Sequence, residues 1–188
     1  ANIQGMRLKL FGYDFFRRAP SSFLPSAQAP VGPDYIIGPG DTVHLILWGS
    51  IQGEHTATVD RSGKISIPKV GVVHVSGLNF RQLREVLDQE LSRQFTNFQM
   101  NVTLENLRTI TVFVVGQARH PGSYTISSLS TLVNALFAAG GPSQLGSLRN
   151  IEVRRGKTTV VRFDFYDFLL RGDKSKDIRL MPEDVIFI

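Results

Sequence analysis

The chain has 188 residues, of which 42% are hydrophobic and 20% are charged, and its net charge is +5. This balance is typical of globular proteins and excludes wholesale disorder, while the length allows one domain or two small ones. The sequence contains no Cys, which excludes disulfides and thiolate metal sites. No apolar run approaches the roughly 20 residues of a membrane-spanning helix, and the start lacks the apolar region of a signal peptide.

The basic side chains are spread along the sequence rather than concentrated on one element. Residues 109–188 hold ten basic and seven acidic side chains. A nucleic-acid interface normally collects Lys and Arg on one surface. Here only Arg154, Arg155 and Lys157 form a tight basic cluster. We therefore expect no nucleic-acid partner.

The first 33 residues form a separate segment, in which an aromatic patch precedes a proline-rich stretch. The patch extends from Leu10 to Phe16, and four prolines follow between Pro20 and Pro33. Prolines at this density favour an extended linker. Because an exposed aromatic patch is sticky, we expect it to dock on the body of the protein. The alternative is contact with a neighbouring subunit or with a missing segment.

Residues 34–108 predict one small sheet with one helix. Residues 79–95 carry an apolar stripe at helical spacing, and Asn79 is suited to cap that helix. Residues 35–41 indicate a short strand that ends in a Gly-Pro-Gly-Asp turn. The other stretches that indicate strands are 42–48, 56–60, 64–67, 70–75 and 99–104. The two stretches on either side of Gly63 are expected to pair as a hairpin.

Residues 109–188 predict a second module of similar size. Ser130 is expected to cap a short helix that ends near Ala139, before Gly140 and Gly141. The expected strands are 110–115, 123–126, 150–154, 159–163 and 184–188, with a helical turn over 165–170. The fold class is therefore α+β: two small β-rich modules in tandem, each a sheet with one main helix, the second one β-grasp-like.

Glycine and proline residues mark the turns, where glycine supplies backbone freedom and proline fixes the chain. Asp41 is expected to hold its own turn by side-chain hydrogen bonding rather than to act as an acid. The Gly-x-Gly at 38–40 is not a dinucleotide fingerprint, because Pro39 interrupts it and a strand follows. The motif residues that we single out as structural are Gly38, Pro39, Gly40, Asp41, Trp48, Gly49, Pro121, Gly122, Gly140 and Gly141.

No pattern in the sequence predicts a catalytic or metal centre. The four histidines are His44, His55, His74 and His120, without metal-ligand spacing on any one element. Three carboxylates, Asp164, Asp167 and Asp173, are candidates for the acidic pair of a glycosidase. However, Asp164 and Asp167 fall at an expected helix start, where carboxylates favour the helix dipole. We therefore expect no enzymatic activity, no metal and no cofactor.

The order of the turn motifs resembles the polysaccharide biosynthesis/export family. Its export domain opens with Tyr-x-Ile-Gly-Pro-Gly-Asp and a strand ending in Trp-Gly, which here are Tyr35 to Asp41 and Trp48-Gly49. Residues 109–188 are similar to the soluble-ligand-binding β-grasp domain that follows in this family. That likeness is carried by Val114-Val115-Gly116, Pro121-Gly122-Ser123-Tyr124, Ala138-Ala139-Gly140-Gly141 and Asp184-Val185-Ile186. The parts implied are 1–33, an aromatic segment and Pro-rich linker; 34–108, an export domain; and 109–188, a soluble-ligand-binding domain.

The resemblance implies a part in the export of a capsular polysaccharide or exopolysaccharide. The intact protein is then expected to be periplasmic and outer-membrane associated, and to form a homo-oligomeric conduit. An inner-membrane polysaccharide co-polymerase is the implied partner. The family's lipid-modified N-terminal Cys and any membrane-spanning C-terminal segment are absent from these 188 residues. The chain also stops directly after an expected strand, where longer members of the family carry further β-grasp repeats, so we expect it to be a piece of that protein. The alternative function is a module that binds a saccharide or a peptidoglycan fragment without a role in transport.

Contacts with the polysaccharide are expected to be weak, because a long polymer must slide past them. The candidates are Arg119, Arg154, Arg155 and Lys157, whose charges would offset the repulsion of an acidic polymer. The alternative is that these four are solvated turn residues. We also expect the 188 residues alone to be a monomer or a weak oligomer.

Overall fold

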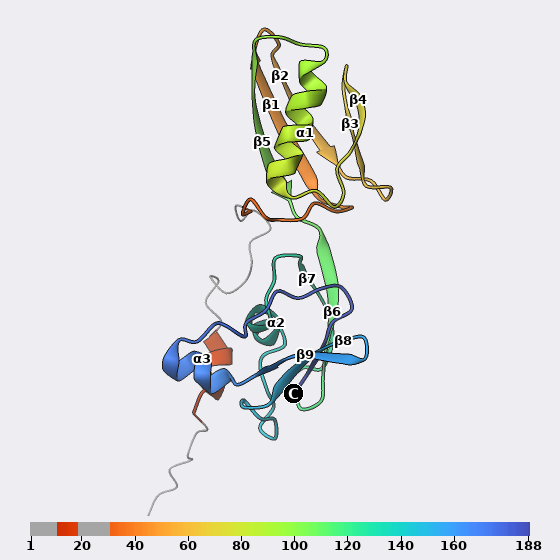
Figure 1. Cartoon of the computed structure of the whole chain (residues 1–188). Helices are drawn as coiled ribbons and strands as arrows, with labels where there is room; N and C mark the ends of the chain where they lie inside the picture. The colour runs from red at the N-terminus through yellow and green to blue at the C-terminus, as the bar shows by residue number, and fades with distance from the viewer. Residues whose placement is uncertain (1–10, 19–30) are drawn as a thin grey trace, which may run out of the picture. The chain divides into compact units, whose positions relative to one another are not determined.

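The computed structural model describes residues 11–18 and 31–188. The chain divides into two compact units, one within residues 26–109 and one formed by residues 110–188 with the N-terminal segment (Figure 1). Both units contain a sheet and helix, which confirms the α+β class of two tandem modules. The unit within residues 26–109 is the first module, and the other unit is the second module. The domain limits expected from the sequence, 34–108 and 109–188, stay predictions. In the described ranges, no helix has the length and apolar character needed to cross a membrane.

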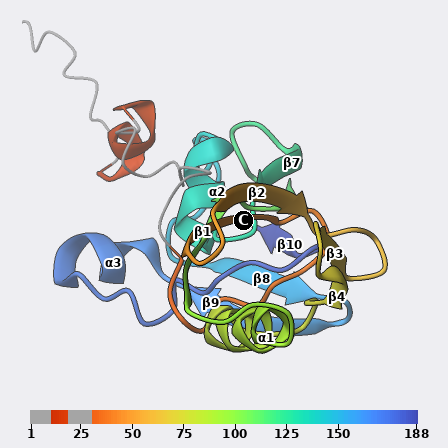
Figure 2. The same ribbon diagram turned by 90° about the horizontal axis from the view of Figure 1, so that it is seen from above.

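The first module contains a three-stranded antiparallel sheet, and its helix runs along one face of that sheet (Figure 1). Figure 2 shows this helix end-on. The strand order is β2-β1-β5. Leu45 of β1 pairs with Val102 of β5 on the buried face, where α1 contributes the buried Leu87. The elements are β1 (Thr42–Gly49), β2 (Gly53–Thr58), β3 (Lys64–Ile67), β4 (Gly71–His74), α1 (Phe80–Ser92) and β5 (Phe98–Asn106).

Helix α1 begins where the sequence predicts. Asn79 Oδ1 accepts a hydrogen bond from the Gln82 backbone N–H at 2.9 Å, and Gln82 Oε1 accepts one from the Asn79 N–H at 2.9 Å. This reciprocal arrangement satisfies two backbone donors that the first turn leaves free. The predicted N-cap is confirmed, and the helix ends at Ser92 rather than near Phe95.

Two strand predictions for the first module are wrong. Residues 64–67 pair with β4 in a separate two-stranded sheet and not with the strand β2. They meet residues 56–60 at the turn, where the Asp60 N–H donates to the Lys64 carbonyl at 2.9 Å. In the turn after β2 the Asp60 carboxylate accepts hydrogen bonds from the Ser62 and Lys64 N–H groups, and the backbone of β3 then pairs with β4 instead of continuing along β2. The short strand expected before the Gly-Pro-Gly-Asp turn is only an isolated bridge between Ile36 and Asn79, because the chain there folds around the buried side chain of Asp41, whereas the turn itself is present.

The second module is a β-grasp sheet with the strand order β7-β6-β10-β8-β9. The last strand, β10, lies between the first and the third strands of the module, parallel to β6 and antiparallel to β8. This arrangement confirms the β-grasp-like prediction. The elements are β6 (Thr109–Val115), β7 (Gly122–Ser127), α2 (Leu132–Ala138), β8 (Ile151–Arg155), β9 (Thr158–Phe163), α3 (Phe165–Arg171) and β10 (Val185–Phe187).

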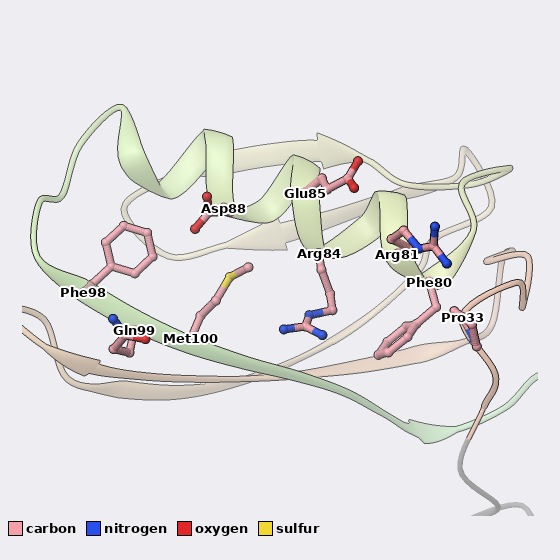
Figure 3. Close-up of a pocket in the computed structure, with 9 residues that line it drawn as sticks. All are labelled: Pro33, Phe80, Arg81, Arg84, Glu85, Asp88, Phe98, Gln99 and Met100. Atoms are coloured by element: carbon pink, nitrogen blue, oxygen red, sulfur yellow. The ribbon is translucent and has the colours of Figure 1, made fainter.

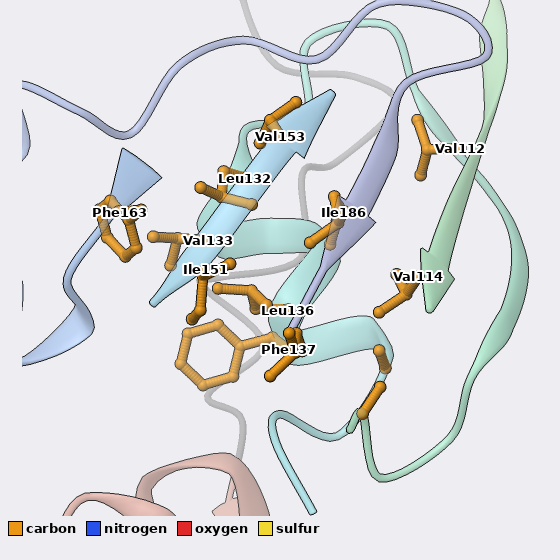
Figure 4. Packing of buried hydrophobic residues seen from close by; sticks show 14 of the residues in the cluster. Val112, Val114, Leu132, Val133, Leu136, Phe137, Ile151, Val153, Phe163 and Ile186 are labelled. Carbon is orange, nitrogen blue, oxygen red and sulfur yellow. The ribbon is translucent and has the colours of Figure 1, made fainter. Parts of the chain in front are cut away.

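Helix α2 packs its apolar face on the inner face of this sheet. Figure 4 shows Leu132, Val133, Leu136 and Phe137 of α2 with Val112, Val114, Ile151, Val153, Phe163 and Ile186 of the strands. The prediction that Ser130 caps this helix is wrong, since the N-cap is Thr131, whose backbone N–H donates to Asn134 Oδ1 at 2.8 Å. The Ser130 carbonyl instead accepts a hydrogen bond from the Leu180 backbone, which holds Ser130 outside the helix.

The aromatic N-terminal segment packs on the second module. It forms a 3-10 helix, η1 (Tyr13–Arg18), in which Phe16 is buried with its ring 4.9 Å from Phe165 and 5.1 Å from Phe137. A Cβ at Gly141 would overlap the Phe16 ring, so a glycine is required there. The expected docking on the body of the protein is confirmed for this segment. The expected linker around Pro20, Pro25 and Pro30 lies outside the described residues.

Replacing Phe16 by Ala is expected to lower the free energy of unfolding of the second module by about 3 kcal/mol, because a packed aromatic ring is lost. Urea unfolding followed by far-UV circular dichroism measures the change. The single Trp, Trp48, lies in the first module and reports separately on that module by fluorescence. Phe11→Ala is the matched control, because Phe11 is 64% exposed. Equal stability of Phe16→Ala and the parent protein would contradict the docking.

Candidate functional site

The Gly-Pro-Gly-Asp turn of the first module is organised around the carboxylate of Asp41, which is fully buried. One carboxylate oxygen accepts hydrogen bonds from the Tyr35 hydroxyl and the Arg108 backbone N–H, both at 2.8 Å. The other accepts from the Gly38 N–H at 2.9 Å and from the Arg108 guanidinium at 2.8 Å. Four donors therefore satisfy the buried carboxylate and balance its charge. Asp41 is the centre of a structural cluster.

Arg108 is the member of this cluster that sequence reasoning missed. Its guanidinium also donates to the Ile36 carbonyl at 3.0 Å and lies 5.6 Å from the centre of the Tyr35 ring. A Cβ at Gly38 would lie 2.8 Å from Arg108 Nη1, so the absent side chain makes room for the guanidinium. Arg108 is 67 residues from Asp41 in sequence, and no local pattern connects the two. The glycine-rich turn thus forms the surface on which the Arg108 guanidinium packs.

The histidines of the first module are placed apart. His44 lies between two carboxylates, with Nε2 2.7 Å from Glu54 Oε1 and Nδ1 3.5 Å from Glu105 Oε1. His55 Nε2 instead lies 2.9 Å from the Ser66 carbonyl oxygen. Within the part of the chain that the structure describes, no group of His, Cys, Asp or Glu is suited to hold a metal ion.

The predicted basic cluster lies at the β8–β9 hairpin, where Arg154 is paired within the protein. Its guanidinium contacts Glu152 at 2.9 Å and lies 4.6 Å from the centre of the Phe187 ring. Arg162 contacts the same carboxylate at 3.1 Å. The hydrogen bond from Arg154 is the main cause that lowers the pKa of Glu152 from its ordinary value. Arg154 and Glu152 therefore form an ion pair at neutral pH.

Arg155 forms a two-pronged ion pair with Asp184, whose side chain is fully buried. Arg155 Nε donates to Asp184 Oδ1 at 2.8 Å, and Nη2 donates to Oδ2 at 2.9 Å. The hydrogen bond to Asp184 raises the pKa of Arg155. Asp184 also accepts from the Met181 backbone N–H at 2.8 Å. Arg155 thus ties the hairpin to the chain that enters β10.

The structure does not bring the four predicted contact residues together. Arg154 and Arg155 end β8 and Lys157 lies in the turn that follows, whereas Arg119 follows the end of β6. Because β10 is parallel to β6 and antiparallel to β8, these two places are opposite ends of the sheet. Lys157 and Arg119 are exposed, and no ion pair among the described residues engages either side chain. Contact of any of the four with a polysaccharide stays a prediction.

The three carboxylates considered for a glycosidase have local roles. Asp164 caps α3 by accepting a hydrogen bond from the Tyr166 N–H at 2.8 Å. Asp167 pairs with Arg171 one turn along the same helix, at 3.4 Å. Asp173 accepts from the Ser175 N–H at 2.8 Å in a turn, and hydrogen bonds from Ser175 lower its pKa. Each carboxylate therefore serves the helix or turn that contains it.

The first module has a hollow of about 570 Å³ between α1 and β5. Figure 3 shows Arg84 extending from α1 between Met100 and Phe80. Charges of both signs come from the same helix, with Glu85 and Asp88 beside the arginines. The lining residues are Pro33, Phe80, Arg81, Arg84, Glu85, Asp88, Phe98, Gln99 and Met100. This arrangement does not resemble two carboxylates facing each other across a glycosidic bond.

Comparisons with known proteins match both modules in order. The model of the polysaccharide biosynthesis/export protein family matches residues 29–105, and the model of the SLBB domain matches residues 111–188. The polysialic acid transport protein KpsD of Escherichia coli is 32% identical over 166 residues, which cover 87% of this chain and 29% of that protein. The EPS I polysaccharide export outer membrane protein EpsA of Ralstonia nicotianae is 29% identical over 119 residues, which cover 62% of this chain and 31% of that protein. The chain thus spans less than a third of the length of these relatives.

Replacing Asp41 by Asn is expected to destabilise the first module by about 3 kcal/mol, because the Arg108 guanidinium loses the charge that compensates it. The transition followed by Trp48 fluorescence in urea measures this loss. Glu105→Gln removes a charge from an exposed position of the same module and is expected to change stability by less than about 1 kcal/mol. An Asp41→Asn protein as stable as the Glu105→Gln protein would show that the cluster does not hold the module together.

Proposed function

The chain belongs to the polysaccharide biosynthesis/export family, and we propose that it is the periplasmic part of an outer-membrane protein that exports a capsular polysaccharide or exopolysaccharide. The observation that carries the proposal is the order of two matched modules on one chain, an export module followed by a β-grasp module. The names of the relatives describe transport and export proteins. The polysaccharide is the proposed cargo, and an inner-membrane polysaccharide co-polymerase is the proposed partner.

The intact protein is further proposed to be a homo-oligomer that forms part of a conduit. Each sheet supports this with strands at its edges, β2 and β5 in the first module and β7 and β9 in the second. An edge strand presents unpaired backbone groups that a neighbouring chain can use. Head-to-tail contacts between identical subunits close into a ring when their rotation permits.

The mass of the full-length protein, extracted from membranes in mild detergent, tests the conduit. We expect a fixed multiple of the subunit mass that does not change on dilution. The 188 residues alone are expected to be a monomer or a weak oligomer, because we expect contacts between single modules to bury less than the roughly 1,000 Å² of a stable interface. In a longer, membrane-associated protein, further segments would raise the effective concentration of the modules. A full-length protein that remains monomeric at all concentrations would contradict the conduit.

Charge on the second module is proposed to ease the passage of an acidic polymer. Arg155 is unsuited to test this, because its neutralisation leaves the buried Asp184 without a partner. Neutralising Arg154, Arg155 and Lys157 together is therefore expected to harm folding. Lys157 and Arg119 are exposed and unpaired within the described residues, so they are the cleaner probes.

Lys157→Gln combined with Arg119→Gln in the full-length protein is expected to slow the appearance of an acidic polymer on the cell surface about twofold. The effect is small because an exposed charge contributes less than about 1 kcal/mol. Pulse labelling of surface polymer measures the rate, and thermal unfolding checks that the fold is intact. Lys176→Gln is the matched control, an exposed Lys elsewhere on the same module. Normal export in cells that lack the protein entirely would instead favour the alternative, a saccharide- or peptidoglycan-binding module.

A further inference from the structure

The face of the first module's sheet opposite the buried Leu45 carries an exposed indole beside uncharged polar side chains. Trp48 is 46% exposed and pairs across the sheet with Gln99. Asn101 and Thr103 follow Gln99 on the same face, because side chains alternate along a strand, and all three are exposed. Since antiparallel partners stand roughly 5 Å apart, an amide lies next to the indole.

Three amide and hydroxyl side chains of this face are free within the described chain, whereas His44 on the same face contacts Glu54 and Glu105. No side-chain hydrogen bond engages Gln99, Asn101 or Thr103 among the residues that the structure describes. The second module differs, because there the one carboxylate on the β8 strand, Glu152, is taken by Arg154 and Arg162. The first module therefore presents donors and acceptors, beside an apolar ring, that remain available to a ligand.

The charge of this face excludes a strong attraction for polyanions. The sequences of β1, β2 and β5 contain no Lys and no Arg. Glu54 and Glu105 lie beside His44 on the same face as Trp48. A ligand for this face must therefore bind through hydroxyl and CH groups rather than through negative charge.

We propose that this face binds uncharged, hydroxyl-rich stretches of a polysaccharide chain, with Trp48 beneath a sugar ring and with Gln99 and Asn101 at its hydroxyl groups. A sugar ring carries CH groups on its faces and hydroxyl groups at its rim. The indole matches the CH face, and the amides, which both donate and accept, match the hydroxyl groups. The choice of ligand class rests on the proposed function, whereas the site rests on the residues of the sheet.

Binding at this face is expected to be weak because the face is open. An open sheet face encloses only one side of a ligand, while enclosed small-molecule sites bury most of the ligand surface. The dissociation constant for a short oligosaccharide is expected to be on the order of 1 mM. Weak, repeated contacts of this kind hold a polymer close to the surface and still let it slide.

The fluorescence of Trp48 tests the proposal directly, because it is the only Trp in the chain. The probe is a neutral glucan oligosaccharide added to the 188-residue protein in millimolar amounts. We expect the oligosaccharide to protect Trp48 from quenching by acrylamide, with glycerol at the same mass concentration as the blank. Protection no greater than that given by glycerol would overturn the proposal.

A double substitution distinguishes binding at this face from a general effect of the sugar on the solvent. Gln99→Ala with Asn101→Ala keeps the Trp48 reporter and is expected to lose the protection. The matched control is Gln94→Ala with Asn150→Ala, which removes the same two exposed amides outside this face. Protection that survives in the first pair, or that is lost equally in both pairs, would overturn the assignment.

An oligosialic acid of the same length tests the charge argument. The carboxylates of Glu54 and Glu105 are expected to make it a poorer protector of Trp48 than the neutral glucan at low salt, with the difference shrinking as salt is added. Stronger protection by the acidic oligomer would overturn the choice of uncharged stretches. Normal export without the protein, together with protection of Trp48, would refute only the proposed function. Export that depends on the protein, without any protection, would refute only this inference.

Discussion

The buried carboxylate of Asp41 is the constraint on which the first module depends. A fully buried charge is stable only when its partners are in place, and here they come from both ends of the module. Tyr35 and Gly38 precede the sheet, and Arg108 follows its last strand. The ion pair between Asp41 and Arg108 therefore joins the two ends of the module. This explains why the turn needs an acid at position 41 and, to make room for the guanidinium, a glycine at position 38.

The second module also depends on a contact between distant parts of the chain. Phe16 precedes the whole first module, yet its ring packs against Phe137 and Phe165 of the second. The first module is thus an insertion between two parts of the second module's fold. The Phe16 ring packs against Gly141, where solvent would otherwise lie. It therefore enlarges the hydrophobic core of the second module beyond what residues 110–188 alone supply.

The features of the fold that were predicted correctly depend on interactions between residues close together in sequence. The helix capped by Asn79 and the alternating strand over residues 42–48 were predictable because capping and periodicity are properties of neighbouring residues. The partner of the strand after Gly63 was not predictable, since β3 pairs with β4 rather than with β2, and no local pattern distinguishes these two partners. The pairing of Arg108 with Asp41, and of Arg155 with Asp184, escaped prediction because each joins residues far apart in sequence. Of the site, the sequence yielded the motif residues but not their partners.

These ion pairs change how the net charge of +5 should be understood. Arg154 and Arg155 are neutralised by Glu152 and Asp184, so the positive excess of the second module does not become a strongly cationic surface at its hairpin. A tight cationic surface would hold an acidic polymer and resist its movement. Uncharged amides beside an exposed indole, in contrast, make contacts that each break at little cost. For a polymer that must move, a surface that relies on hydroxyl and CH contacts is the better suited of the two.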